Sequence, residues 1–239
     1  MEIKKQLTVL TVHFNTPRMM EACLRSLAKQ TPGCRVVVVD NSDRYPFNID
    51  CCKDLPLAIE YIDNTHGQLI DFDYWLRRYP DARPRESNYG SPKHCKTINI
   101  CFKLLPEGFI LMDSDVLFKR DITPLWDETK AWVGEPFLDT PKGIHVMRLL
   151  PFLCYINVPM CVENDIHYFN PDWMWHLTLQ SPNKWYDTGA WFYKDCMAKD
   201  MPFKAIKTSK YIEHYFHGSH ATLNGGMDEW LETNKKLWL

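Results

Sequence analysis

The chain has 239 residues, and the 45 % that are hydrophobic are enough to build the core of one large domain. Its formal net charge is −2, from 28 basic and 30 acidic residues, so it lacks the basic balance that nucleic-acid binding requires. We therefore expect a globular protein with no nucleic-acid partner.

Nine cysteines, an odd number, include no Cys-x-x-Cys pair, and no hydrophobic leader precedes them. Cys23, Cys101 and Cys154 lie within apolar patterns and are predicted to be small buried side chains. The sequence has no run of about 18 apolar residues, so no membrane-spanning helix is predicted. These features predict free thiols and a cytoplasmic location.

The first half of the chain alternates strand and helix patterns. Apolar and β-branched runs predict strands at 7–14, 35–40, 57–62 and 109–112. Helical spacing predicts helices from Pro17 to before Pro32, with Thr16 as N-cap, and over 69–79 and 93–105. Parallel strands need such crossover helices. We therefore predict an α/β fold with a mostly parallel central sheet flanked by helices.

The second half is less regular. Short strands are predicted at 131–135, 153–158 and 203–206, and helices at 173–179, 190–199 and 228–239. The last helix is amphipathic, so it could touch a membrane surface or cap the core. No internal repeat or linker divides the chain, which predicts a single domain over 1–239.

Two carboxylates, Asp113 and Asp115, follow the strand predicted at 109–112. Residues i and i+2 of a strand point to the same side, so both acids can reach one bound cation. Oxygen ligands suit Mg²⁺ or Mn²⁺, which is commonly shared with substrate phosphates. A solvated acidic turn is the alternative, because Asp-x-Asp is a short motif.

Polar side chains also end the first two strands, namely His13, Asn15, Asp40 and Ser42. Ligands of open α/β sheets bind beyond the carboxyl ends of the strands, so we expect these groups to converge with the acid pair. Asp40 could accept a hydrogen bond from a nucleobase or ribose, or serve as a turn residue. No glycine-rich dinucleotide motif or P-loop is present, so phosphate charge would be handled by a metal.

Four segments, taken in order, resemble the nucleotide-diphospho-sugar glycosyltransferases of GT-A fold, nearest to family 2; they are Thr8–Pro17, Leu24–Leu27, Val37–Asp43 and Ile110–Val116. The resemblance covers residues 7 to about 120. It implies that the first strand and the Asp40–Ser42 turn hold the nucleobase and ribose. It also implies that Asp113, Ser114 and Asp115 hold the donor diphosphate through a divalent ion. His13 stands where the family usually has threonine, a departure at the base contact.

The resemblance also implies roles for residues outside these four segments. Lys93 and His94 would touch phosphate or sugar, unless they are a solvated helix start. Asp187 would be the base that deprotonates the acceptor hydroxyl, and its alternative is an N-cap. Asp172, Glu163 and Asp165 are weaker candidates for the base.

Three histidines lie close together late in the chain, at positions 214, 217 and 220. The segment resembles the family's late His-x-x-Gly-x-Ser motif, in which a histidine completes the metal shell or contacts the diphosphate. Either His214 or His217 would be that ligand, and imidazole is acceptable to Mn²⁺ beside carboxylates. A surface histidine cluster is the alternative.

The resemblance implies a metal-dependent glycosyltransferase that uses Mn²⁺ or Mg²⁺. It would transfer a sugar from a nucleotide-diphosphate donor to a glycan or lipid-linked acceptor, with inversion, in bacterial polysaccharide assembly. Residues to about 120 would bind the nucleotide sugar, and residues from about 121 the acceptor. A lipid-linked acceptor would bring the protein to the inner membrane face. A nucleotidyltransferase and a non-catalytic module that binds sugar nucleotides or glycans are the alternatives.

Overall fold

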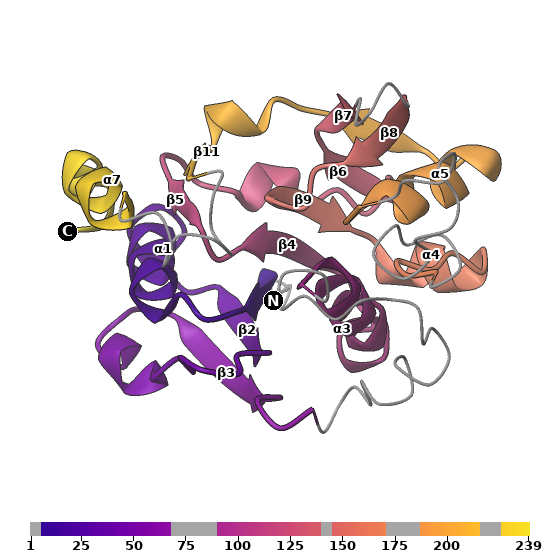
Figure 1. Ribbon diagram of the computed structural model, residues 1–239. Coiled ribbons are helices and arrows are strands. Elements are labelled where there is room, and N and C mark those ends of the chain that lie inside the picture. The colour runs from indigo at the N-terminus through magenta and orange to yellow at the C-terminus, as the bar shows by residue number, and fades with distance from the viewer. Residues whose placement is uncertain (1–5, 68–89, 140–144, 171–186, 216–225) are drawn as a thin grey trace, which may run out of the picture.

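The computed structural model describes residues 6–67, 90–139, 145–170, 187–215 and 226–239. A central sheet separates two helical layers (Figure 1). Its seven strands run in the order β10-β6-β9-β4-β1-β2-β3. Their bounds are β1 Thr8–His13, β2 Arg35–Asp40, β3 Ala58–Asp63, β4 Phe109–Asp113, β6 Trp132–Gly134, β9 Leu153–Ile156 and β10 Phe203–Ala205.

Neighbouring strands of this sheet are parallel except at β9, which runs antiparallel to both β4 and β6. The predicted α/β fold with a mostly parallel central sheet is therefore confirmed. Strands β1, β2 and β4 are buried along almost their whole length, as expected of parallel strands covered on both faces.

Helix α1 (Pro17–Gln30) covers one face of the sheet. Pro17 occupies its first turn, where the missing N–H costs nothing, and Thr16 is the N-cap without a side-chain capping bond. Leu24 and Leu27 pack with the strand residues Val36 and Ile110. The helix ends before Pro32, as predicted.

Helices α3 (Gly90–Leu104), α4 (Val158–Glu163) and α5 (Ala190–Ala198) cover the other face. Val9 faces the α1 layer and Leu10 faces the α3 layer, so side chains alternate along β1 as the period of a strand requires. Helix α3 begins three residues before the predicted start at 93. The helices predicted at 69–79 and 173–179 lie outside the described residues.

Two small antiparallel sheets stand beside the main one. Strand β5 (Val116–Phe118) pairs with β11 (Ile212–His214), and β7 (Pro136–Asp139) pairs with β8 (Val146–Leu149). Single 3₁₀ turns lie at Ile49–Cys52, Thr123–Leu125 and Thr208–Lys210.

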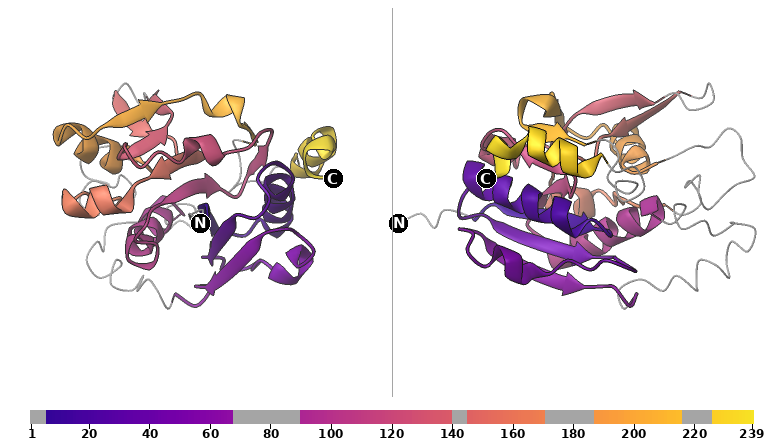
Figure 2. Two further views of the ribbon diagram at one scale, coloured as in Figure 1. Left: turned by 180° about the vertical axis from the view of Figure 1, so that it is seen from behind. Right: turned by 60° about the vertical axis from the view of Figure 1, so that its left-hand side comes forward.

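The C-terminal segment forms two short helices, α7 (Met227–Thr233) and α8 (Lys235–Trp238), where one was predicted. Figure 2 shows both beside α1. Leu231 is fully buried with Met19 and Leu117, and Trp238 donates its indole N–H to the carbonyl of Leu231. The tail therefore caps the core, one of the two roles foreseen for it.

All nine cysteines are free thiols, and Cys51 alone is not classed as buried. The prediction that Cys23, Cys101 and Cys154 are buried is confirmed. Within the described ranges, no helix is long and apolar enough to cross a membrane.

Candidate functional site

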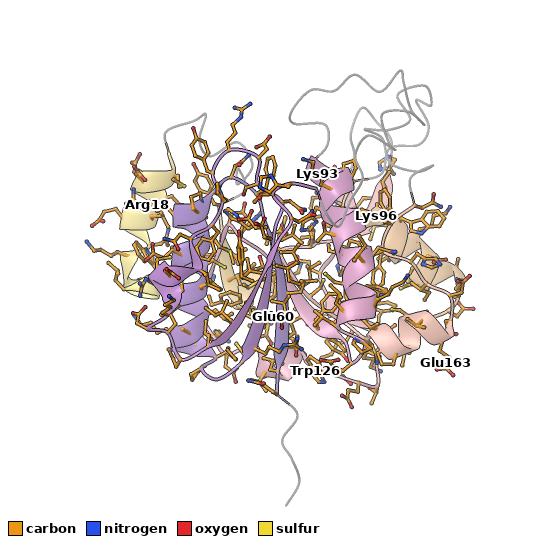
Figure 3. All side chains as sticks on the ribbon, turned by 90° about the horizontal axis from the view of Figure 1, so that it is seen from below. Arg18, Glu60, Lys93, Lys96, Trp126 and Glu163 are labelled. Atoms are coloured by element: carbon orange, nitrogen blue, oxygen red, sulfur yellow. The ribbon has the colours of Figure 1, made fainter. Side chains whose placement is uncertain are left out.

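The carboxyl ends of β1, β2 and β4 meet at one edge of the sheet. His13 lies opposite Asp40 in the β1–β2 register, and Val12 lies opposite Asp113 in the β1–β4 register. Figure 3 shows Lys93, near the start of α3, toward this edge, whereas Trp126 and Glu163 lie toward the other end of the molecule. The predicted convergence of the three strand ends is thus present.

His13 and Asp40 form a buried pair that joins the first two strand ends. Both side chains are inaccessible to solvent, and His13 Nδ1 lies 3.0 Å from Asp40 Oδ1. The backbone N–H of Thr16 donates to His13 Nε2 at 3.1 Å, so this nitrogen carries no hydrogen. The Nδ1–H therefore donates to Asp40, and the ring is held in a single tautomer.

The Asp40 carboxylate accepts further hydrogen bonds. Ser42 N donates to Oδ1 at 2.9 Å, Phe47 N to Oδ2 at 2.7 Å and the Tyr61 hydroxyl to Oδ2 at 2.9 Å. Burial raises the pKa of Asp40, but the bonds from His13, Ser42 and Phe47 outweigh it and hold the pKa well below its usual range. A direct contact between this carboxylate and a ligand would require some of these bonds to open.

Asn15 fastens the loop that follows β2. It adopts a left-handed backbone conformation, φ 57°, which asparagine tolerates better than most residues. Its side-chain oxygen accepts from the backbone N–H groups of Arg44 and Tyr45, both at 3.0 Å. The backbone N–H of Asn15 donates to Ser42 Oγ at 2.8 Å. Asn15 and Ser42, both predicted as donor-site residues, thus shape the loop at this edge.

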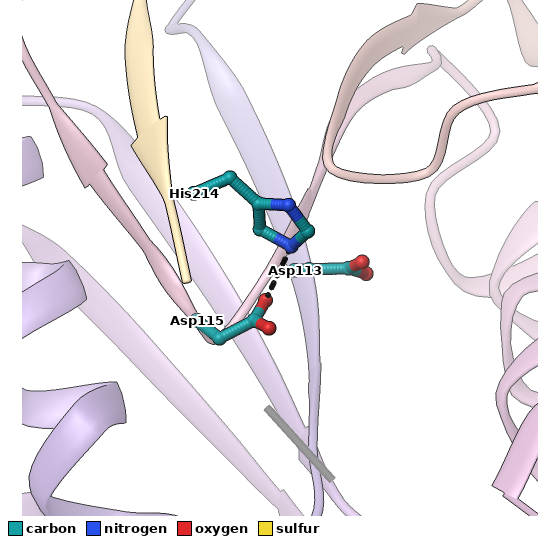
Figure 4. A group of neighbouring side chains, drawn as sticks. All are labelled: Asp113, Asp115 and His214. Carbon is teal, nitrogen blue, oxygen red and sulfur yellow. Dashed lines mark ion pairs between the residues drawn. The ribbon is translucent and has the colours of Figure 1, made fainter. Parts of the chain in front are cut away.

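The acid pair and one histidine form a separate cluster at the end of β4. One ligand atom from each of Asp113, Asp115 and His214 lies within 4.8 Å of the others. His214 Nε2 is 3.2 Å from Asp115 Oδ1, the contact dashed in Figure 4. Asp115 is buried, and the other two residues are partly buried.

A short strand pair delivers His214 to this cluster. Strand β11 pairs with β5 so that His214 lies opposite Val116, the residue after Asp115. The N–H of Tyr215 also donates to the Asp115 carbonyl at 3.0 Å. Of the two predicted histidine ligands, His214 is therefore placed with the acids, whereas His217 lies outside the described residues. Ser114 lies in the turn between β4 and β5.

The donor set fits a divalent cation. Two carboxylates and one imidazole suit Mn²⁺, and carboxylates also suit Mg²⁺. Two carboxylates held this close repel each other, and a bound cation would relieve that repulsion. Asp113, Asp115 and His214 would hold the ion.

Helix α3 adds two groups beside this cluster. His94 Nε2 lies 3.3 Å from Asp113 Oδ1, so the predicted donor-site histidine contacts one acid of the Asp113–Asp115–His214 cluster. Lys93 Nζ lies 5.7 Å from the ring centre of Phe14, after β1. Burial lowers the pKa of Lys93, and Asp43 opposes that change. Both side chains therefore face the strand ends rather than a purely solvated helix start.

Asp187 forms an ion pair that the sequence did not indicate. Its Oδ2 lies 3.2 Å from Arg148 Nη1, and Arg148 Nε lies 3.4 Å from Asp139 Oδ2. The N-cap of α5 is Gly189, so the alternative of Asp187 as the N-cap is wrong. Gly189 has φ 81°, and a Cβ there would collide with the carbonyl oxygen of Leu149.

Cys95 of α3 connects the surroundings of Asp187 with those of Asp113. Burial raises the pKa of this thiol to about 12; a hydrogen bond with Thr188 lowers it, and the charges of Asp187 and Asp113 raise it further. One buried thiol is therefore within electrostatic range of both carboxylates.

The weaker base candidates lie elsewhere. Strand β9 places Ile156 opposite Phe109, at the amino edge of β4, and α4 follows from there to Glu163. Asp165 pairs with His167 at 3.1 Å, with the side chains 89 % and 57 % exposed. The structure argues against both as the base, and Asp172 lies outside the described residues.

No protein-family model and no curated protein sequence match this chain. Two solved structures of the galactosyltransferase LgtC, one with donor and acceptor sugar analogs and one an active-site mutant, match it with TM-scores of 0.50 and 11 % identity. Each match covers 84 % of this chain, and 74 % and 73 % of the LgtC chains. The bifunctional glycosyltransferase WbbM matches at 0.49 and 10 % identity, over 87 % of this chain but only 40 % of its own.

At these identities the likeness is one of fold. The expected GT-A-like glycosyltransferase fold is confirmed, and the family 2 assignment stays a prediction.

Proposed function

We propose that this protein is a metal-dependent glycosyltransferase that moves a sugar from a nucleotide-diphosphate donor to a glycan or lipid-linked acceptor. The observation that carries the proposal is the cluster of Asp113, Asp115 and His214 at the carboxyl edge of a GT-A-like sheet. Ligands of open α/β sheets bind at this edge, and diphosphates are commonly bound through Mg²⁺ or Mn²⁺.

Each group has a chemical role in this proposal. A cation bound at Asp113, Asp115 and His214 would neutralise the leaving diphosphate. Lys93 would add positive charge beside it. The turns fastened by Asn15 and the His13–Asp40 pair would present the nucleobase and ribose surface, mainly through backbone and loop groups, because both members of that pair are buried.

Asp187 is the proposed base for an inverting displacement. It would accept the proton of the acceptor hydroxyl as that oxygen attacks the anomeric carbon. The ion pair with Arg148 orients its carboxylate, and Asp139 holds the other side of the guanidinium. The β7–β8 hairpin that carries Asp139 and Arg148 would then border the acceptor.

Membrane contact and cytoplasmic location belong to the same proposal. A lipid-linked acceptor would bring the protein to the inner face of a membrane. The tail supplies little for such contact, because Leu231 is buried against α1 and Leu239 alone among its large apolar residues is highly exposed, at 65 %.

The first arm of the test measures donor binding. The melting temperature of the full chain is recorded with nucleoside diphosphates and nucleotide sugars, in Mn²⁺ or in EDTA. We expect a metal-dependent rise with one nucleotide, absent in Asp115→Ala and retained in the control Asp165→Ala. No rise with any nucleotide in folded protein would overturn the donor-site assignment.

The second arm measures transfer with the donor found in the first. Asp187→Asn should slow transfer by about 100-fold or more while donor binding is unchanged, because base catalysis contributes at that scale. Asp139→Asn is the matched control, since it removes the other partner of Arg148 and leaves the base. Binding of the donor without turnover in the native chain would identify a non-catalytic module instead.

A further inference from the structure

Phe152 lies where the backbone of the sheet meets the metal cluster. It follows the β7–β8 hairpin and precedes β9, whose first residue, Leu153, lies opposite Met112 of β4. The backbone N–H of Asp113 donates to the Phe152 carbonyl at 3.3 Å. The residue therefore continues the β4–β9 pairing to the first metal-site acid.

The side chain of Phe152 reaches another member of the cluster. Its ring stacks on the imidazole of His214, with ring centres 3.7 Å apart and planes 29° apart. Phe152 is partly buried and also packs against the apolar layer under α1. Its backbone thus contacts Asp113, and its ring contacts His214.

These two contacts bear on the orientation of His214, which lies at the end of a short strand. It ends β11, which has three residues and pairs with a strand of three. An imidazole can turn about its Cβ–Cγ bond, and turning it would carry Nε2 away from Asp115. A flat ring stacked on the imidazole face limits that rotation, as outer contacts of metal-ligating histidines commonly do.

We infer that Phe152 is a positioning residue of the metal site, and that its stacked ring sets the affinity for Mn²⁺ by holding His214 in the orientation that binds. The inference rests on the proposed function for the ion itself. It adds a residue for which the sequence carries no motif.

The test measures Mn²⁺ binding by titration calorimetry with the metal alone. It compares the native full chain with the full-length variants Phe152→Leu, Phe152→Met and Phe152→Tyr. Leu and Met remove the ring, so we expect the dissociation constant to rise about tenfold. Tyr keeps the ring, so its dissociation constant should stay within about twofold of the native value. If Phe152→Leu does not fold, Phe152→Met carries the comparison.

Phe203→Leu is the matched control. Phe203 also stacks on an aromatic ring, Trp132, with ring centres 4.6 Å apart. It lies at the opposite end of the sheet, because Trp132 is opposite Ile156 and Ile156 is opposite Phe109. This variant should lose stability while its Mn²⁺ affinity is unchanged.

The outcomes separate the two proposals. Native protein that binds neither Mn²⁺ nor Mg²⁺ would overturn the metal site of the proposed function, and the role of Phe152 with it. Native protein that binds Mn²⁺, with equal affinity in a folded Leu or Met variant, would overturn the role of Phe152 alone. An equal loss of affinity in Phe203→Leu would also overturn it, since the effect would then follow general stability.

Discussion

Two clusters of carboxylate and imidazole lie at the same edge of the sheet, and their surroundings differ. At the β1–β2 edge, Asp40 is fully buried and accepts bonds from His13, two backbone N–H groups and Tyr61. At the β4–β5 edge, the carboxylates of Asp113 and Asp115 lie close to each other, and each has one imidazole beside it, His94 at Asp113 and His214 at Asp115.

The difference teaches how to separate structural acids from ligand-binding acids. In a buried carboxylate whose two oxygens both accept hydrogen bonds, the negative charge is already stabilised by the protein, and the group contributes to the stability of the fold. Two carboxylates that face one another gain most from a cation supplied from outside. Both clusters occupy strand ends in the sequence, so strand position alone does not distinguish them.

The largest effect expected from this comparison is on stability at Asp40. In Asp40→Asn, one side-chain NH₂ would face N–H donors that now bond to oxygen, which leaves buried donors unsatisfied. We expect a loss of about 3 kcal/mol, the lower end for breaking a buried charged pair. For a domain of this size, that lowers the melting temperature by roughly 6–12 °C. An unchanged melting temperature would show that Asp40 is not a structural acid.

The pH dependence of the same variant gives a smaller effect. The pKa of Asp40 is lowered in the folded state, so its stabilisation is present above the unfolded value of about 3.9 and is lost as pH falls through the folded value. The stability difference between native protein and Asp40→Asn should therefore be constant near neutral pH and shrink below about pH 4. Urea unfolding at stepped pH measures it, and a difference that grows in acid would contradict the assignment.

The smallest effect is expected at the other cluster. Asp113→Asn, in the presence of EDTA, should change the free energy of unfolding by less than about 1 kcal/mol, because the lost charge also relieves repulsion with Asp115. With Mn²⁺ added, the native chain should gain stability and the variant should not. Thermal melting in both conditions measures these changes. A loss of stability in EDTA as large as that of Asp40→Asn would show that Asp113 is a structural acid like Asp40.

Much of the fold could be predicted from the sequence. The strand bounds at 35–40 and the helix from Pro17 follow from a continuous apolar run and from capping chemistry, both of which are local signals. Strands β5 and β11, of three residues each, were not predicted, because so few residues carry no periodicity. Strands β6 and β10 are equally short but lie within the longer runs predicted at 131–135 and 203–206. The β7–β8 hairpin was missed for a similar reason.

The site was predictable where its residues follow strand ends and less so elsewhere. Asp113 and Asp115 were foreseen as a metal-binding pair with either His214 or His217 beside them, and the structure brings His214 to the two acids. The number of hydrogen bonds that Asp40 accepts was not foreseen, since one of the donors, Tyr61, comes from another strand. Arg148 and Phe152 carried no sequence signal either, because each becomes relevant only through a contact with a residue far away in the sequence.

The pairing of β5 with β11 also bears on the order of folding. Asp113 and Asp115 share one turn, whereas His214 arrives from near the end of the chain. Closing so long a loop costs conformational entropy before the contacts it brings together stabilise the fold, so such contacts form late. The three ligands are therefore together only once the chain has folded as far as β11, and an ion held there would secure that long-range contact.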